Sequence, residues 1–215
     1  MSLKRNLEIS DLENVFKGRK PGAEEGFRFF SILVPVVQKE DKLFLLYNVR
    51  AKHMVRQPGE ICFPGGEIEG DETPQACALR ETFEEIGIRE DDIKIINQLD
   101  TIYTYNNFLM HCFLGVVDES ALDQMVLNPD EVEEVFLISL DEIMEIKPDI
   151  YKIVSIPQIP EDFPEDRVAG GEPYKWRRGQ AIVPIYYVEN RAIWGLTARI
   201  TKRLIEVLRG GLCSE

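Results

Sequence analysis

Three glutamates at helical spacing constrain this chain more than any other feature of its sequence. Glu81, Glu84 and Glu85 stand at positions i, i+3 and i+4, so on a helix they share one face. Like charges at this spacing repel one another and lower helix stability, and carboxylates near the C-terminal end also oppose the helix dipole. Hard oxygen ligands that converge from one face suit Mg²⁺ or Mn²⁺. Two interpretations stay open at this point: a metal-binding face and a solvated acidic surface.

Signals at both ends predict that this helix spans residues 73–86. Thr73 is a good N-cap residue, Pro74 suits the first helical position, and Gly87 suits the residue that ends a helix. The apolar residues of the segment are expected on the stripe opposite to the glutamates: Ala76, Leu79, Phe83 and Ile86. This stripe would fix the helix on a sheet, so that the charged stripe presents its side chains in a rigid geometry.

Composition excludes several classes of protein. The 215 residues suit one domain with elaborations, and the 44% of hydrophobic residues argues against disorder. The longest nearly unbroken apolar run, Phe29–Val37, is far shorter than the ~20 residues of a membrane span. With 25 Lys+Arg against 38 Asp+Glu, the net charge of −13 disfavours a nucleic-acid partner. The scattered cysteines and the lack of a signal-peptide core lead us to expect a cytoplasmic protein without a membrane partner.

Alternation of apolar segments and helix signals predicts an α/β fold with a mixed β-sheet and a helix on each face. Strands are expected over residues 27–38, 42–49, 60–63, 93–104, 108–117, 133–138 and 181–188, and further helices over 140–145 and 193–208. In this interpretation residues 1–26 are a peripheral lead-in. Residues 27–215 are a single domain, with a Pro/Gly-rich excursion at about 148–180. The apolar first strand offers a way to pair with a second copy, so a homodimer is also considered.

The segment around the glutamates resembles the Nudix box. That motif has a glycine and a glutamate, followed by Arg-Glu-U-x-Glu-Glu-x-Gly-U, where U is a bulky apolar residue. The matching residues here are Gly66, Glu72 and the run RETFEEIGI at residues 80–88. All other fixed positions agree, and the one departure is Thr82, which stands at the first U position.

The resemblance implies a Nudix-type α/β/α sandwich that hydrolyses a nucleoside diphosphate linked to another moiety, with Mg²⁺ or Mn²⁺ as cofactor. It makes Glu81 and Glu85 the first candidates for metal ligands, whereas Glu84 is either a ligand or a base that orients water. Gly65 and Gly66 let the loop backbone approach closely. A main-chain carbonyl at Gly65 is therefore expected in the metal shell, and both glycines are expected at the substrate.

Two more residues are candidates for the catalytic set. Arg80 can pair with a neighbouring carboxylate and orient it; the alternative is an ordinary surface ion pair. Glu131 lies in a later loop and is a candidate for an additional acid; the alternative is a surface glutamate at the start of a strand. The identity of the group that takes the proton stays open.

A basic strip precedes the acidic helix. Residues 42–60 carry four Lys or Arg and one acid, whereas residues 67–92 carry two Lys or Arg and ten acids. Next to a metal site, such a strip suits an extra substrate phosphate that the metals do not reach. Arg50 and Arg56 are the candidates for binding it; the alternative is a loop whose charges only keep the protein soluble.

The stretch LYNVRAKHMVRQPGEICFPGG, residues 46–66, resembles the signature that precedes the Nudix box in coenzyme A diphosphatases, and residues 128–136 and 193–198 resemble later parts of that subfamily. This narrower resemblance implies a small-molecule nucleotide substrate. Coenzyme A or a derivative would be cleaved to 3′,5′-ADP and 4′-(acyl)phosphopantetheine. The 3′-phosphate then gives Arg50 and Arg56 a purpose, and the excursion at 148–180 is a candidate cover for the acyl or pantetheine end.

Two other functions are weighed against this one. The first is another nucleoside-diphosphate hydrolase, acting on ADP-ribose, an NDP-sugar or a dinucleotide, which needs no contact for a 3′-phosphate. The second is a non-catalytic Nudix binding module. Such modules commonly lose carboxylates of the box, whereas Glu81, Glu84 and Glu85 are all present here.

Overall fold

The computed structural model of the protein describes residues 7–20, 22–24, 26–168 and 174–212. Its main sheet contains β1 (Arg28–Lys39), β2 (Lys42–Arg50), β3 (Ile61–Cys62), β4 (Gly65–Glu67), β5 (Ile93–Gln98), β6 (Ile102–Tyr103), β7 (Phe108–Val117) and β8 (Val132–Ser139). The sheet is mixed, because β1 is antiparallel to β2 and parallel to β7. The strand order is β3-β2-β1-β7-β5, and β4, β6 and β8 pair with β1, β7 and β2 respectively.

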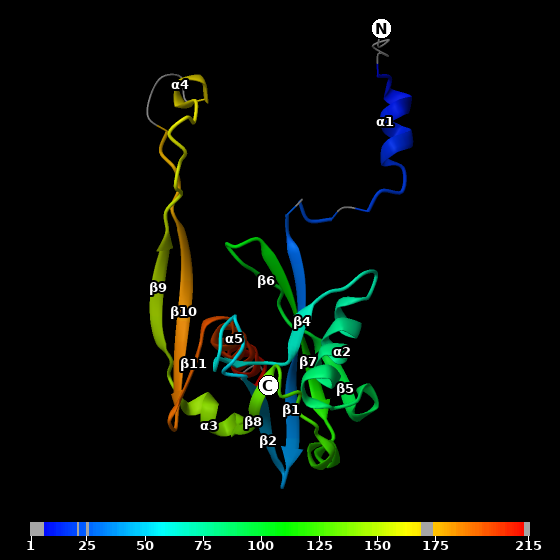
Figure 1. Ribbon diagram of the computed structural model, residues 1–215, viewed down its shortest axis with the longest axis vertical. Helices are drawn as coiled ribbons and strands as arrows, with labels where there is room; N and C mark the ends of the chain where they lie inside the picture. The colour runs from blue at the N-terminus through cyan, green and yellow to red at the C-terminus, as the bar shows by residue number, and fades with distance from the viewer. Residues whose placement is uncertain (1–6, 21, 25, 169–173, 213–215) are drawn as a thin grey trace.

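A helix covers each face of this sheet, as predicted. The helices are α1 (Ile9–Phe16), α2 (Pro74–Ile86), α3 (Leu140–Glu145), α4 (Glu165–Val168) and α5 (Gly195–Leu212), with 3-10 turns η1 (Glu90–Asp92) and η2 (Glu119–Gln124). α2 and α5 lie on opposite sides of β1 (Figure 1). Leu33 and Leu79 belong to the core under α2. Tyr47 belongs to the core under α5, where its hydroxyl lies 3.0 Å from that of Thr201.

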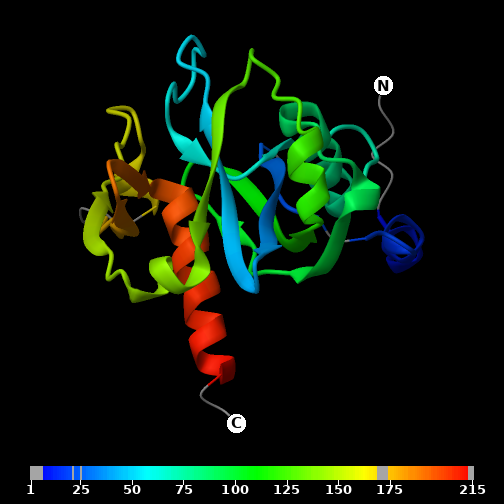
Figure 2. The same ribbon diagram turned by 90° about the horizontal axis from the view of Figure 1, so that it is seen from below.

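A second, smaller sheet stands beside α5. It consists of β9 (Asp149–Ser155), β10 (Gly179–Val188) and β11 (Arg191–Trp194), all antiparallel. β9 and β10 form an antiparallel ribbon, and the excursion expected at 148–180 contains β9, α4 and the first residues of β10. Viewed from below, the ribbon and α5 lie on one side of β1 and β2, and α2 lies on the other (Figure 2).

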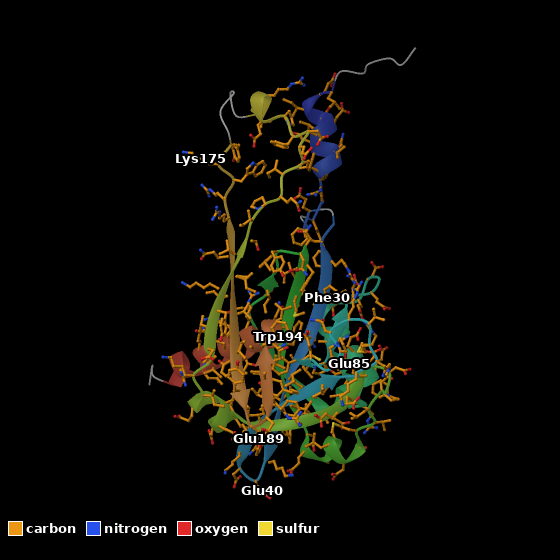
Figure 3. All side chains as sticks on the ribbon, turned by 60° about the vertical axis from the view of Figure 1, so that its left-hand side comes forward. Phe30, Glu40, Glu85, Lys175, Glu189 and Trp194 are labelled. Atoms are coloured by element: carbon orange, nitrogen blue, oxygen red, sulfur yellow. The ribbon has the colours of Figure 1, made fainter. Side chains whose placement is uncertain are left out.

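The ribbon points away from the glutamates of α2. Figure 3 labels Lys175, near the ribbon's end, and Glu85, on α2, and the two lie far apart along the molecule. Figure 1 agrees, since α4 and α2 lie on different sides of the molecule. In the described residues the ribbon does not reach the glutamates of its own chain, and the expectation that residues 148–180 cover the acyl or pantetheine end stays a prediction.

Most predicted elements are confirmed, and two are corrected. The single strand expected over 93–104 is divided into β5 and β6. The helix expected from Ile193 begins at Gly195, because Ile193 and Trp194 pair with β10 in β11. Gly195 makes the turn between them with φ +65°, a backbone conformation that glycine adopts without strain. Trp194, the last residue of β11, is 45% exposed (Figure 3).

The first apolar strand is not available for pairing with a second copy. β1 is hydrogen-bonded to β2 and β4 on one side and to β7 on the other, so its backbone groups are used inside the sheet. The expectation of a homodimer through this strand is wrong for that reason.

Within the described part of the chain, no helix is long and apolar enough to cross a membrane. The division into a lead-in of residues 1–26 and one domain stays a prediction.

Candidate active site

α2 begins and ends as its sequence predicts. The Thr73 hydroxyl accepts a hydrogen bond of 3.2 Å from the Ala76 amide, and Pro74 opens the first turn. At the other end Gly87 has φ +76°, and its amide donates to the Phe83 carbonyl at 2.8 Å. The helix is therefore capped at both ends by its own residues, and its orientation on the sheet is fixed by packing.

The buried face of α2 differs from the predicted one. Phe83 is 54% exposed, whereas Glu85 is 3% exposed and Thr82 is fully buried. The helix is thus rotated so that one of the three glutamates turns toward the sheet. Thr82 is accommodated because its hydroxyl donates to the Ala78 carbonyl at 2.6 Å, so no polar group is left unpaired. The expectation that the apolar and acidic stripes lie opposite each other is wrong.

The two loop glycines before α2 are both required by close approach, but to different neighbours. A Cβ on Gly65 would overlap the Ser31 carbonyl and the Ile32 backbone, whereas a Cβ on Gly66 would overlap the Glu81 carboxylate. The loop backbone therefore lies against the carboxylate of Glu81, which is the close approach that the sequence predicts for this glycine pair.

Alanine at these two positions is expected to have separable effects. Gly65→Ala forces the backbone apart and should cost about 1–3 kcal/mol of stability. Gly66→Ala meets only the end of a flexible side chain, so we expect near-normal stability. Turnover should nevertheless fall about tenfold or more, because the Glu81 carboxylate is displaced. Thermal unfolding and turnover, measured on both variants, test this; a Gly66→Ala protein with wild-type turnover would contradict the close approach.

Glu85 is the most deeply buried carboxylate of the site. Its Oε2 accepts a hydrogen bond of 2.8 Å from Asn48 Nδ2 on β2. Burial raises the pKa of Glu85 to about 8, and the negative charges of Glu131 and Glu81 add to this rise, whereas Arg50 and a hydrogen bond from the Gly65 backbone oppose it. The site therefore brings together an acidic cluster from α2 and the loop before β8, with one arginine from β2.

Arg80 binds the other carboxylates. Its guanidinium donates to Glu72 at 2.8 and 3.1 Å, to Glu81 at 2.8 Å and to Glu84 at 2.9 Å. The hydrogen bonds from Arg80 lower the pKa of Glu72 to about 2. The pKa of Glu81 is instead raised, mainly by burial, although Arg80 opposes this. The side chains of Arg80, Glu72 and Glu81 are 27%, 18% and 14% exposed, so this is a partly buried network and no ordinary surface pair.

The loop that carries Glu131 is tied to both neighbours of the site. The Asn128 amide donates to the Glu85 carbonyl at the end of α2, and the Ala51 amide donates to the Glu131 carbonyl, each at 2.9 Å. Glu131 is thereby held where its charge raises the pKa values of both Glu85 and Glu81. The structure thus places Glu131 near Glu81 and Glu85, and its role as an additional acid stays a prediction.

The two arginines of the basic strip occupy different environments. Arg50 is half-buried, its charge acts on Glu85, and its buried Nε has no hydrogen-bond partner among the described residues. Arg56 is exposed in the loop that follows β2. A third cation of the strip, Lys52, is engaged with Glu133 at 3.0 Å. The strip is thus not a uniform basic surface.

The donor chemistry of the cluster suits a hard divalent cation. Glu81, Glu85 and Glu131 are close enough to influence one another, and the buried Oδ1 of Asn48 has no partner among the described residues. As the side chains lie, no three His, Cys, Asp or Glu groups in the described part of the chain converge on one point. The reason is visible in the contacts, since Arg80 holds Glu81 and Glu84 while Asn48 holds Glu85.

Sequence reasoning missed the contributions of Asn48 and Glu72. Asn48 is a polar residue inside the apolar run 42–49, and it is completely buried. A buried polar residue in a strand needs a partner, and this signal alone would have indicated a contact such as that with Glu85. The sequence identifies Glu72 only as part of the motif, whereas its hydrogen bonds from Arg80 show that it holds the guanidinium.

The sequence of the chain is similar to those of known proteins. The NUDIX domain matches residues 28–156. Over 137 residues the chain is 36% identical to the Mus musculus protein named peroxisomal coenzyme A diphosphatase NUDT7, covering 62% of this chain and 56% of that protein. Over 183 residues it is 27% identical to Mus musculus mitochondrial coenzyme A diphosphatase NUDT8, covering 84% and 78%. Over 116 residues it is 37% identical to Caenorhabditis elegans Nudix hydrolase 3, covering 53% and 48%.

The match spans about half the length of the first and third of these relatives. Among solved structures, a MutT/nudix family protein from Enterococcus faecalis superposes with a TM-score of 0.52 at 14% identity, covering 94% of this chain and 70% of that one. This likeness concerns the fold alone, and with it the predicted sandwich of a mixed sheet between helices is confirmed.

Proposed function

Since the chain belongs to the NUDIX domain family, we propose that it hydrolyses the diphosphate bond of coenzyme A or of a derivative. The products would be 3′,5′-ADP and 4′-phosphopantetheine or its acylated form. The observation that carries the proposal is the cluster of Glu81, Glu85 and Glu131 beside the Gly65–Gly66 loop and Arg50. Two relatives that are named coenzyme A diphosphatases support the choice of substrate.

Nudix hydrolases generally use divalent metal ions, and the residues here fit such an ion. Glu81 and Glu85 would hold it, with the Gly65 carbonyl as a further ligand, and Glu84 would be either a ligand or the base that orients water. When bound, Mg²⁺ or Mn²⁺ supplies neutralisation of the diphosphate charge and acidification of a bound water. Removal of divalent metal by a chelator should therefore abolish turnover.

The protein's own residues position the reacting groups. Arg80 holds Glu81 and Glu84 in fixed orientations, and Asn48 does the same for Glu85. Such pre-positioning contributes to catalysis because the ligands need not be ordered when the substrate binds. Glu84, which is 53% exposed, and Glu131, in its anchored loop, are the two candidates for the group that accepts the proton of the attacking water.

We assign different phosphates to the two arginines. Arg50 is half-buried beside Glu85, and its Nε has no hydrogen-bond partner among the described residues, which suits a contact with the diphosphate itself. Arg56 is exposed in the loop after β2, which suits the peripheral 3′-phosphate of coenzyme A. Arginine binds phosphate through paired hydrogen bonds, so each contact should be worth about 1.5–3 kcal/mol.

Substitution of the two arginines tests this assignment. Arg56→Ala should lower kcat/KM for coenzyme A roughly 10- to 100-fold and leave dephospho-coenzyme A almost unaffected. Arg50→Ala should lower kcat/KM for both substrates. The control is Lys39→Ala, a substitution of an exposed cation at the far end of β1. Equal losses on both substrates for Arg56→Ala would remove this residue from the 3′-phosphate, and preference of the wild type for ADP-ribose would favour the alternative diphosphatase.

The cytoplasmic location stays a prediction for this chain. The relatives named above carry peroxisomal and mitochondrial locations in their names, and the coenzyme A reaction fits any compartment that holds the substrate.

A further inference from the structure

Helix α1 is an amphipathic helix with no buried residue. Its apolar side chains lie on one face, and all are at least half exposed: Ile9 76%, Leu12 52%, Val15 71% and Phe16 59%. Figure 1 shows α1 beyond the end of β1, clear of the two sheets. Isolated helices of fewer than about 12–15 residues are marginal in water, so a helix of eight residues with such a face needs a surface to pack against.

The described residues line a large groove of matching character. A cavity of about 890 Å³ lies between β6 with its preceding loop, β10 and α5. Its apolar lining includes Leu99, Ile102, Leu114, Ile182, Leu204 and Val207. Ile182 and Val207 are 50% and 47% exposed, which shows that the groove is open to solvent. Grooves of this kind bind the apolar face of an amphipathic helix.

The apolar surface continues from the groove along the ribbon. Ile182 and Pro184, which line the groove, stand opposite Lys152 and Ile150 in the antiparallel register of β10 and β9. Directly opposed residues share a face of the ribbon, and Ile150 is 46% exposed. A two-stranded ribbon is only marginally stable by itself, so this face also benefits from a partner.

The charges of the helix and of the groove are complementary. Residues 8–16 contain the acids Glu8, Asp11 and Glu13 and no Lys or Arg. Around the groove, the cations Lys152, Arg199, Lys202 and Arg203 outnumber the acids Asp100 and Glu206. Two of these cations are already paired within the groove wall, Lys202 with Glu206 and Arg203 with Asp100. Arg199 and Lys152 thus give the groove its excess positive charge, within a chain whose net charge is −13.

We propose that α1 of one copy of this chain docks in the groove between β6, β10 and α5 of a second copy, and that the second copy returns the same contact. Within the described residues, each chain has an exposed apolar helix face and an open apolar groove, so reciprocal exchange covers both. A stable interface buries roughly 800 Å² per partner. Two such contacts approach this area, and a single contact should hold a weaker dimer that forms at the upper end of the protein concentrations used. The exchange closes on itself as a two-fold dimer.

The first test is the mass of the full chain in solution, by light scattering after size exclusion over roughly 1–100 μM protein. The wild type is expected to be a dimer. Leu12→Asp places a charge on the apolar face of α1 and should weaken the dimer at least tenfold. Asn14→Asp makes the same charge change on the opposite face of α1 and should leave the dimer intact. Leu12 lies outside the core, so unfolding of the domain does not explain a loss.

A mixing experiment tests whether α1 of one copy contacts the groove of another copy. Val207→Asp alters the groove and should also give a monomer. When the Leu12→Asp and Val207→Asp proteins are mixed, the intact helix of one can enter the intact groove of the other. Dimers should then reappear, with one contact instead of two. A wild type that is monomeric throughout this range, a dimer that survives Leu12→Asp, or a mixture that stays monomeric overturns the proposal. A mixture that stays monomeric is the result expected if α1 docks in the groove of its own chain.

Discussion

Glu85→Gln is expected to lower turnover at least ~10²-fold while leaving the fold intact. The substitution keeps the size and the oxygen that accepts from Asn48, and it removes a negative charge where a divalent cation would bind. Because Glu85 is 3% exposed, replacement of its carboxylate by a neutral amide should not lower the free energy of unfolding, and relief of a buried charge can raise it. Turnover with saturating metal and thermal unfolding are measured together.

A matched control makes this result specific to the site. Glu90→Gln makes the same chemical change in the exposed turn η1, four residues after the end of α2 at Ile86. It should change neither turnover nor stability. Wild-type turnover in Glu85→Gln would exclude Glu85 from the metal shell. A fall in turnover that is matched by a fall in the unfolding temperature would indicate instead that the residue is structural.

Arg80→Ala is expected to cost about 3 kcal/mol of folding free energy and to reduce turnover as well. The guanidinium holds Glu72, Glu81 and Glu84 together. Its removal leaves two carboxylates, each less than a fifth exposed, without their cation. The loss of turnover has a separate origin, since Glu81 and Glu84 would no longer be oriented.

The pH dependence of the free energy of unfolding tests the ion pair between Arg80 and Glu72. Arg80 lowers the pKa of Glu72 from 4.5 to about 2 in the folded protein. A carboxyl group with a lowered folded pKa stabilises the protein above its unfolded pKa, and this contribution is lost as the pH falls toward the folded value. Urea unfolding between about pH 5 and pH 2 should therefore show a steep loss in the wild type and a weaker one in Arg80→Ala.

A double-mutant cycle provides the control for Arg80. Glu72→Gln alone should also weaken the pH dependence, and the effects of Arg80→Ala and Glu72→Gln on stability should not add, because the two residues are in direct contact. Additive effects would mean that the ion pair contributes nothing of its own. In that case the stability loss in Arg80→Ala would come from packing of the arginine stem.

The ends of α2 could be predicted from the sequence, whereas its rotation could not. Thr73, Pro74 and Gly87 act through local hydrogen bonds and backbone angles, which the local sequence determines. The buried face depends on what lies opposite. Periodicity assigns Phe83 to the core and Glu85 to solvent, and the structure reverses both because Asn48 on β2 offers Glu85 a buried partner. Asn48 and Glu85 are 37 residues apart in the sequence, so the periodicity of the helical segment alone cannot predict their contact.

The difference between local signals and contacts of distant residues also decides which other elements of the fold could be predicted from the sequence. Strands that alternate or run continuously apolar, such as 108–117, were predicted with their bounds, since each pattern is complete within its own segment. The sequence predicts β10 as a strand over 181–188, whereas β9 lies in the segment interpreted as an excursion, because Pro, Gly and charged residues surround its short apolar run. The register that pairs Ile150 with Pro184 has no local signal. The position of Glu131 at the site was predicted through the resemblance to a family, and the loop contacts that hold it were not.

The most direct test of the account is identification of the products formed from coenzyme A. The wild-type protein is incubated with coenzyme A and Mg²⁺ or Mn²⁺, with Glu85→Gln and a chelator as controls, and the products are resolved by mass spectrometry. The account predicts equal amounts of 3′,5′-ADP and 4′-phosphopantetheine, which appear only with metal and with Glu85 in place. Intact coenzyme A under conditions in which the protein cleaves ADP-ribose, or no cleavage of any diphosphate, would contradict it.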